Sequence, residues 1–116
     1  MRNRMRCFLV FSLLALGWAA GGCHLPNLHG PVPAPLATSR QLSQQAAASL
    51  ERGQQPEAEA LLAKAVKTCP TDPDARHYYA EALWLRDARA EAAGQLEEAC
   101  RLTPEEPSLR VRLAEM

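Results

Sequence analysis

The most constraining feature of the sequence is an internal repeat with a period of 34 residues, which covers its C-terminal two thirds. With that offset, alanines align with alanines and prolines with prolines. The matching positions are Ala46, Ala80 and Ala114, Ala48 and Ala82, Arg52 and Arg86, Ala58 and Ala92, Leu62 and Leu96, Ala65 and Ala99, Pro70 and Pro104, Pro73 and Pro107, Arg76 and Arg110, and Glu81 and Glu115. A fixed period of this length indicates a stack of similar structural units.

Each unit contains two segments with helical periodicity. Apolar or small residues recur three and four positions apart, as in Ala58, Leu61, Leu62 and Ala65, which is the pattern of an amphipathic helix. Turn-forming stretches with proline or glycine separate these segments, and Thr71 or Asp72 can cap the helix that follows them. The sequence therefore predicts an all-α fold, with helices at 39–52, 56–68, 73–86, 89–102 and 107–115.

These features resemble the tetratricopeptide repeat (TPR) family, whose unit is two antiparallel helices over 34 residues. Small residues lie where the helices cross, at Ala46, Ala58 and Ala65 in the first unit, and Pro70 closes that unit. The resemblance implies a short solenoid over residues 38–116, with about two repeats and a final capping helix. The first helix departs from the family pattern because Leu42, Gln45 and Ser49 replace bulkier residues.

The N-terminus predicts export. Three arginines precede an apolar run from residue 7 to 20, which is typical of a secretory signal and too short to span a bilayer comfortably. The run ends in Ala20-Gly21-Gly22-Cys23, which resembles the bacterial lipobox, although Ala20 stands where that pattern usually has leucine. The resemblance implies a lipoprotein-type signal peptide at 1–22 and lipidation of Cys23. Ordinary cleavage and an uncleaved short anchor are the alternatives.

Residues 23–37 predict an extended tether. Four prolines and one glycine fall within residues 24–37, a composition that excludes a regular helix or a central strand. A lipid at Cys23 would then hold the repeat domain at a cell envelope membrane, on the periplasmic side or at the cell surface.

The sequence predicts no catalytic site, cofactor or metal. It lacks the patterns of nucleophilic, acid–base, phosphate-binding and zinc chemistry. His77 and Glu81 lie four residues apart, but two ligands are too few for a metal. Nucleic-acid binding is also disfavoured, because ten basic side chains are dispersed among thirteen acidic ones after residue 22.

Cys69 and Cys100 have two interpretations. An exported compartment permits a disulfide between them, and the alternative is that each packs separately as a small apolar residue. Their spacing matches neither a redox nor a zinc motif.

The TPR resemblance implies that the first helix of each unit lines a concave surface that holds a peptide or partner helix. Trp84 is the strongest candidate anchor on that surface, because large amphipathic rings are frequent at interfaces. The family's asparagine and lysine set for a terminal carboxylate is absent, with Ser43 and Ala47 in its place. The predicted concave face comprises Arg40, Ser43, Ala47, Leu50, Asp74, His77, Glu81, Trp84, Ser108, Val111 and Glu115.

The sequence thus favours a non-enzymatic, membrane-tethered module that binds a protein at the bacterial envelope. Two alternatives remain open at this stage. The protein could be an assembly subunit that forms a homo-oligomer by burying Leu109 and Leu113 of its last helix, or the chain could be a fragment of a longer array, since it ends within a unit.

Overall fold

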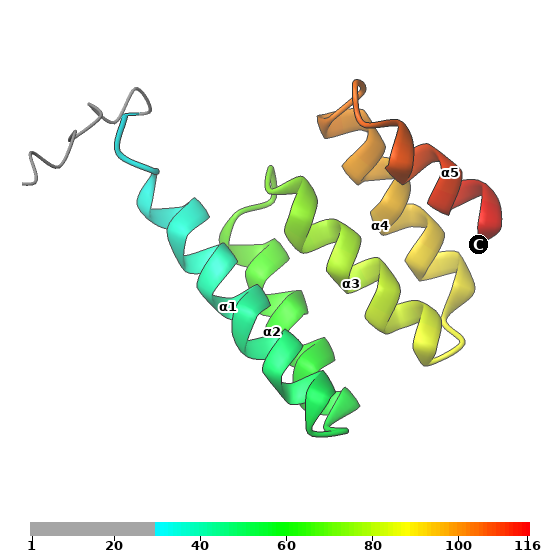
Figure 1. Cartoon of the computed structure of the whole chain (residues 1–116), viewed down its shortest axis with the longest axis horizontal. Coiled ribbons are helices and arrows are strands. Elements are labelled where there is room, and N and C mark those ends of the chain that lie inside the picture. The colour runs from blue at the N-terminus through cyan, green and yellow to red at the C-terminus, as the bar shows by residue number, and fades with distance from the viewer. Residues whose placement is uncertain (1–29) are drawn as a thin grey trace, which may run out of the picture. The chain divides into compact units, whose positions relative to one another are not determined.

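A computed structural model describes residues 30–116 of the chain. The predicted signal peptide, Cys23 and most of the predicted tether lie outside these residues. The described part contains five helices and no strand: α1 (Ala34–Glu51), α2 (Gln55–Thr68), α3 (Pro73–Leu85), α4 (Arg89–Leu102) and α5 (Pro107–Glu115) (Figure 1). None of these helices has the length and apolar character needed to cross a membrane.

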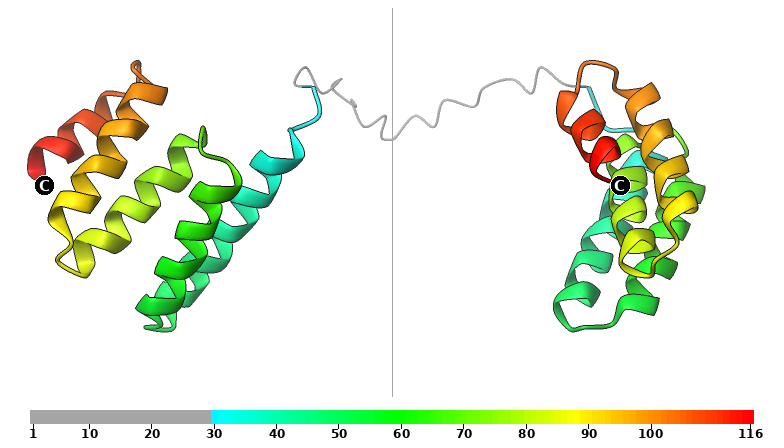
Figure 2. Two further views of the ribbon diagram at one scale, coloured as in Figure 1. Left: turned by 180° about the vertical axis from the view of Figure 1, so that it is seen from behind. Right: turned by 90° about the vertical axis from the view of Figure 1, so that its right-hand side faces the viewer.

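The helices form two hairpins and a last single helix. The α1 helix packs on α2, α3 packs on α4, and α5 packs on α4, while α2 and α3 join the two hairpins. In the right-hand view of Figure 2, α2 and α4 lie on one side of this stack and α1 and α5 on the other. The predicted fold, a short all-α TPR-like stack, is confirmed.

Four of the five predicted helices begin and end within one residue of their predicted bounds. The first prediction is wrong at its start, because α1 begins at Ala34 instead of residue 39 and takes in residues 34–37 of the predicted tether. Pro33 is the N-cap residue and Pro35 lies in the first turn, where the missing N–H costs no helical hydrogen bond. The prolines that indicated a tether therefore also fit the start of a helix.

Fully buried alanines set the spacing between the helices. Seven alanines are 0–1% exposed, and all lie on the faces where helices meet; they are Ala46, Ala58, Ala65, Ala75, Ala80, Ala92 and Ala99. Leu62, Leu83 and Leu96 are the largest apolar side chains buried to the same degree. Small side chains let the helix backbones approach closely. The core is therefore built from many close contacts between alanines and leucines, and not from a few large aromatic side chains.

The 34-residue repeat is visible in the backbone as well as in the sequence. The turn inside each hairpin has one residue with a left-handed backbone, Gly53 (φ 74°) in the first unit and Asp87 (φ 64°) in the second. Between units, Arg76 Nε donates a hydrogen bond to the Pro70 carbonyl (2.8 Å), and Arg110 Nη2 donates to the Pro104 carbonyl (2.6 Å). Residues 34 positions apart thus perform the same structural task.

Asp72 links the start of α3 to α1 through hydrogen bonds of its carboxylate. Its Oδ1 accepts hydrogen bonds from the backbone N–H groups of Asp74 (3.1 Å) and Ala75 (3.4 Å), as a helix N-cap does. Its Oδ2 accepts a hydrogen bond from the buried Ser39 hydroxyl at 2.7 Å. Of the two predicted caps, Asp72 is the one that the structure uses, and it also fixes the distance between the two first helices.

Candidate functional site

A groove runs between α1 and α3, the first helices of the two units. It consists of two hollows of about 240 and 80 Å³ that share Ser43, Ala47 and Tyr78. The larger hollow is also lined by Arg40, Gln44, Asp72 and Asp74, and the smaller by Ala46, Leu50, Leu62 and Glu81. We call these two hollows together the α1–α3 groove.

The two ends of the α1–α3 groove differ in chemistry. The end near Leu50 is mainly apolar, with alanines and leucines on its walls, and its one charged residue, Glu81, is paired with Arg112. The end near Arg40 carries charged side chains from both helices, Arg40 from α1 and Asp74 from α3. Tyr78 stands between the two ends and is 52% exposed, so its ring is available to a bound segment.

Ser43 lies where the two hollows meet, and its hydroxyl is unsatisfied. Among residues 30–116, Ser43 Oγ is the one buried side-chain oxygen or nitrogen that has no hydrogen-bond partner. A buried polar atom without a partner is costly. The lining of the groove thus contains a hydroxyl that its own chain leaves unused, and this covered oxygen reaches a bound segment once the side chain rotates toward the hollow.

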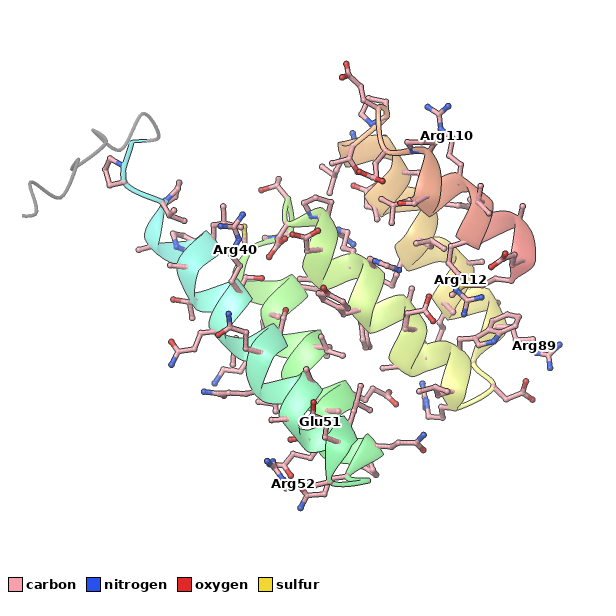
Figure 3. The ribbon with its side chains drawn as sticks, in the orientation of Figure 1. Arg40, Glu51, Arg52, Arg89, Arg110 and Arg112 are labelled. Carbon is pink, nitrogen blue, oxygen red and sulfur yellow. The ribbon has the colours of Figure 1, made fainter. Side chains whose placement is uncertain are left out.

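An ion pair joins α5 to α3. Arg112 of α5 donates from Nε to Glu81 Oε1 at 2.6 Å and from Nη2 to Glu81 Oε2 at 2.8 Å. His77 Nε2 lies 3.6 Å from Glu81 Oε1, on the same helix face. Figure 3 shows Arg112 extending from α5 toward α3. We call the Glu81–Arg112 pair the α3–α5 clasp.

The clasp changes the acidity of Glu81. The two hydrogen bonds from Arg112 hold the pKa of Glu81 below its usual value, although partial burial of the carboxyl acts in the opposite direction. Hydrogen bonds from a guanidinium favour the charged carboxylate. Glu81 is therefore charged over the whole neutral range and keeps α5 attached to α3.

Trp84 contacts two arginines of its own chain. The guanidinium carbons of Arg89 and Arg112 lie 5.1 and 6.0 Å from the centre of the Trp84 ring, a geometry that allows cation–π attraction. Arg89 in turn forms an ion pair with Asp87 at 2.7 Å. The predicted anchor is thus half-buried in an intramolecular cluster with the clasp, and its contact with a partner stays a prediction.

The structure divides the predicted concave-face residues into two groups that share Glu81, which lines the smaller hollow of the groove and also forms the clasp. Arg40, Ser43 and Asp74 meet in the α1–α3 groove. His77, Glu81 and Trp84 gather around the clasp. Val111 is 60% exposed on α5.

The sequence prediction missed Tyr78 and Arg112. The repeat itself could have indicated them, because Gln44, Tyr78 and Arg112 occupy one position of the 34-residue period. That position faces the neighbouring first helix in both cases. Tyr78 lines the α1–α3 groove, and Arg112 forms the clasp on α3.

The two cysteines of the described part are free thiols. Cys69 is buried, with its Sγ 3.7 Å from the Thr71 hydroxyl. Cys100 packs against the cluster of Ala80, Leu96 and Leu109. Over the same residues, no group of three histidine, cysteine or acidic side chains is placed to hold a metal ion.

Comparison with known families finds a repeat in the part of the chain that forms the groove. Residues 40–82 match the tetratricopeptide repeat. The matched stretch runs through α1 and α2 and most of α3, so it contains both walls of the α1–α3 groove. No curated protein matches the chain. TPR repeats are typically protein–protein interaction modules, which suggests such a role for this repeat.

Proposed function

We propose that this protein binds a protein partner through the α1–α3 groove without catalysing a reaction, and that a lipid on Cys23 tethers it to a bacterial envelope membrane. The observation that carries the binding proposal is the groove itself. Its two hollows are smaller than the roughly 300–1,000 Å³ of a typical small-molecule site, and they open side by side along two helices. Such a surface suits the successive side chains of a peptide.

Several features of the groove support a peptide occupant. Tyr78 offers an exposed ring, the apolar end accepts an aliphatic side chain, and Ser43 leaves a hydroxyl for a backbone or side-chain polar group. Interfaces commonly combine an aromatic anchor, an apolar pocket and a few polar contacts. Because the two hollows lie between α1 and α3, and the clasp already engages the Glu81 carboxylate, we place the main contact on α1 and α3.

Site-specific photo-crosslinking tests the groove. A photoreactive residue at Gln44, which lines the groove, should crosslink to a discrete partner in bacterial cells. The matched control places the same residue at Lys64, which is exposed on α2. Crosslinks of equal yield from both positions, or from Lys64 alone, would contradict binding through the groove.

The tether rests on the sequence, and a mass measurement tests it. The protein recovered from bacterial membranes should begin at Cys23 and carry a lipid-sized mass increment, and the Cys23→Ser variant should lose that increment. More than one acyl chain gives stable anchoring, at about 0.8 kcal/mol per buried CH₂. An unmodified mass that begins at another residue would show ordinary secretion or a signal anchor and would overturn the proposal.

A further inference from the structure

Arg40 differs from every other arginine in residues 30–116. Seven of these arginines donate to a carboxylate, a carbonyl or an amide of the chain itself: Arg52, Arg76, Arg86, Arg89, Arg101, Arg110 and Arg112. Arg40 has no such partner within this part of the chain, and it lines the groove. Within residues 30–116, its guanidinium is therefore the unpaired positive charge of the α1–α3 groove, which is the surface used by the proposed function.

The unsatisfied Ser43 hydroxyl lies three residues from Arg40 on the same helix. Residues three apart on a helix are neighbours on one face, and both side chains line the larger hollow of the groove. Figure 3 shows Arg40 on the N-terminal half of α1. Once the covered Ser43 hydroxyl rotates toward the hollow, it and the Arg40 guanidinium can both donate to one carboxylate, a strong type of hydrogen bond.

The acidic residues opposite Arg40 are already stabilised by their own helix. Asp72 accepts hydrogen bonds from Ser39 and from two backbone N–H groups, and Asp74 lies in the first turn of α3. The positive end of a helix dipole favours acidic side chains at those positions. Arg40 lies inside α1 and has no corresponding compensation, so it is the charge of the larger hollow that its own helix stabilises least.

From these observations we infer that the partner segment carries an aliphatic side chain for the apolar end of the groove and a neighbouring acidic side chain for Arg40 and Ser43. The aliphatic group lies between Leu50, Leu62 and Tyr78, in the smaller hollow. The carboxylate lies in the larger hollow. This inference rests on the proposed function and specifies the chemistry of the segment that the groove accepts.

Selection of peptides from a random displayed library on the full chain tests the inference. Enriched peptides should combine an aliphatic residue with Asp or Glu a few positions away. For a synthetic peptide of that type, Arg40→Gln should weaken binding by about two- to fivefold, as expected for an exposed ion pair. Ser43→Ala should also weaken it, and Asp74→Asn should tighten it, because it removes from the groove a charge of the same sign as the peptide carboxylate.

Two further variants separate this inference from the proposed function. Arg101→Gln, which changes an exposed arginine on α4, is the control for a loss of general positive charge, and Ala47→Trp fills the groove. If Ala47→Trp abolishes binding but Arg40→Gln acts no more strongly than Arg101→Gln, the groove binds peptides and the inference is overturned.

Enrichment of basic peptides whose binding is weakened by Asp74→Asn overturns the inference as well. If no peptide is enriched, or if Ala47→Trp has no effect, the proposed function fails too. Circular dichroism of each variant checks that the fold is intact.

Discussion

Ala58 and Ala92 occupy the same position in the two units, and neither side chain exposes any surface. Ala58 packs against Ala46, Leu62 and Ala82, where α1, α2 and α3 meet. Because the backbones approach closely at this point, a larger side chain has to push helices apart. The identity of single small residues thus decides how the helices are spaced and, through that spacing, how wide the α1–α3 groove is.

Ala58→Leu should lower the free energy of unfolding by about 1–3 kcal/mol, since over-packing forces side chains and backbone to shift. Urea denaturation of the purified protein measures this value. Ala60→Leu is the matched control, because Ala60 is exposed on the same helix, and a surface change of this kind stays within about 0.5 kcal/mol. Equal effects of the two substitutions would contradict the helix crossing at Ala58.

The turn at Gly53 provides a test of backbone conformation alone. Its φ of 74° is in the left-handed region, and a Cβ placed on it meets no atom within 4 Å. Gly53→Ala should therefore destabilise the fold by about 1–2 kcal/mol through backbone strain and not through a clash. Thermal denaturation can check the sign.

Gly94 gives the opposite case to Gly53, because it lies within a helix, where alanine is more favourable than glycine. It lies inside α4 and is exposed, and a Cβ added to it would also have open space around it. Gly94→Ala should stabilise the protein by up to about 1 kcal/mol, because alanine has the higher helix propensity. A loss of stability in both alanine variants would argue against the left-handed turn as the cause at Gly53.

At the level of the helices, α5 depends on contacts with the rest of the chain. It has nine residues, and isolated helices of that length are marginal in water. Leu109 packs on Ala80, Leu96 and Ala99, and Arg112 joins Glu81 in the clasp. Apolar packing around Leu109 and one ion pair thus hold the last helix in place.

The clasp makes the attachment of α5 sensitive to acid. Glu81 has a lowered pKa in the folded protein, so its contribution to stability is complete above the unfolded pKa of about 4.3. That contribution is lost as the pH falls through the lowered folded pKa, where the carboxylate becomes protonated. Arg112→Gln should therefore be less stable than the wild type at pH 7, and the difference should shrink in acid.

Urea denaturation at pH 7 and at successively lower pH measures this convergence. Glu81→Gln serves as the second variant, since it removes the same charge pair from the other side. A stability difference that does not depend on pH in either variant would show that the clasp contributes packing but no charge interaction.

At the level of the whole molecule, α5 covers the end of the apolar core. Leu109 is only 6% exposed in the single chain, and Leu113 and Met116 pack against the same cluster. The alternative in which an oligomer buries Leu109 is therefore disfavoured, because the chain already buries this side chain by itself. The exposed apolar residue that α5 offers is Val111.

We accordingly expect the helix content of the Cys23→Ser variant, which lacks the proposed lipid, to be independent of dilution. An obligate oligomer loses structure as its concentration falls. Circular dichroism at 222 nm over a hundredfold dilution series, together with sedimentation analysis, tests this expectation. A fall in helix content on dilution would restore the assembly alternative.

The sequence by itself determined the helices and their order. Four of the five helices have the predicted bounds within one residue, and six of the seven fully buried alanines, all except Ala75, form pairs 34 residues apart. These properties are local or periodic: helical spacing, prolines and glycines act within a few residues, and a repeat brings the same residues to the same contacts. The start of α1 escaped prediction because prolines indicate a tether and a first helical turn equally well.

Only the tertiary structure decided how the predicted concave face is divided. Glu81 and Arg112 are 31 residues apart in the chain, yet their hydrogen bonds join α3 to α5, and the guanidinium of Arg112 also lies over the ring of Trp84. The same stacking leaves the α1–α3 groove open, with Arg40 unpaired and Ser43 unsatisfied within residues 30–116. Which polar groups find a partner depends on side-chain directions and distances between stacked units, and these quantities exist only once the helices are packed.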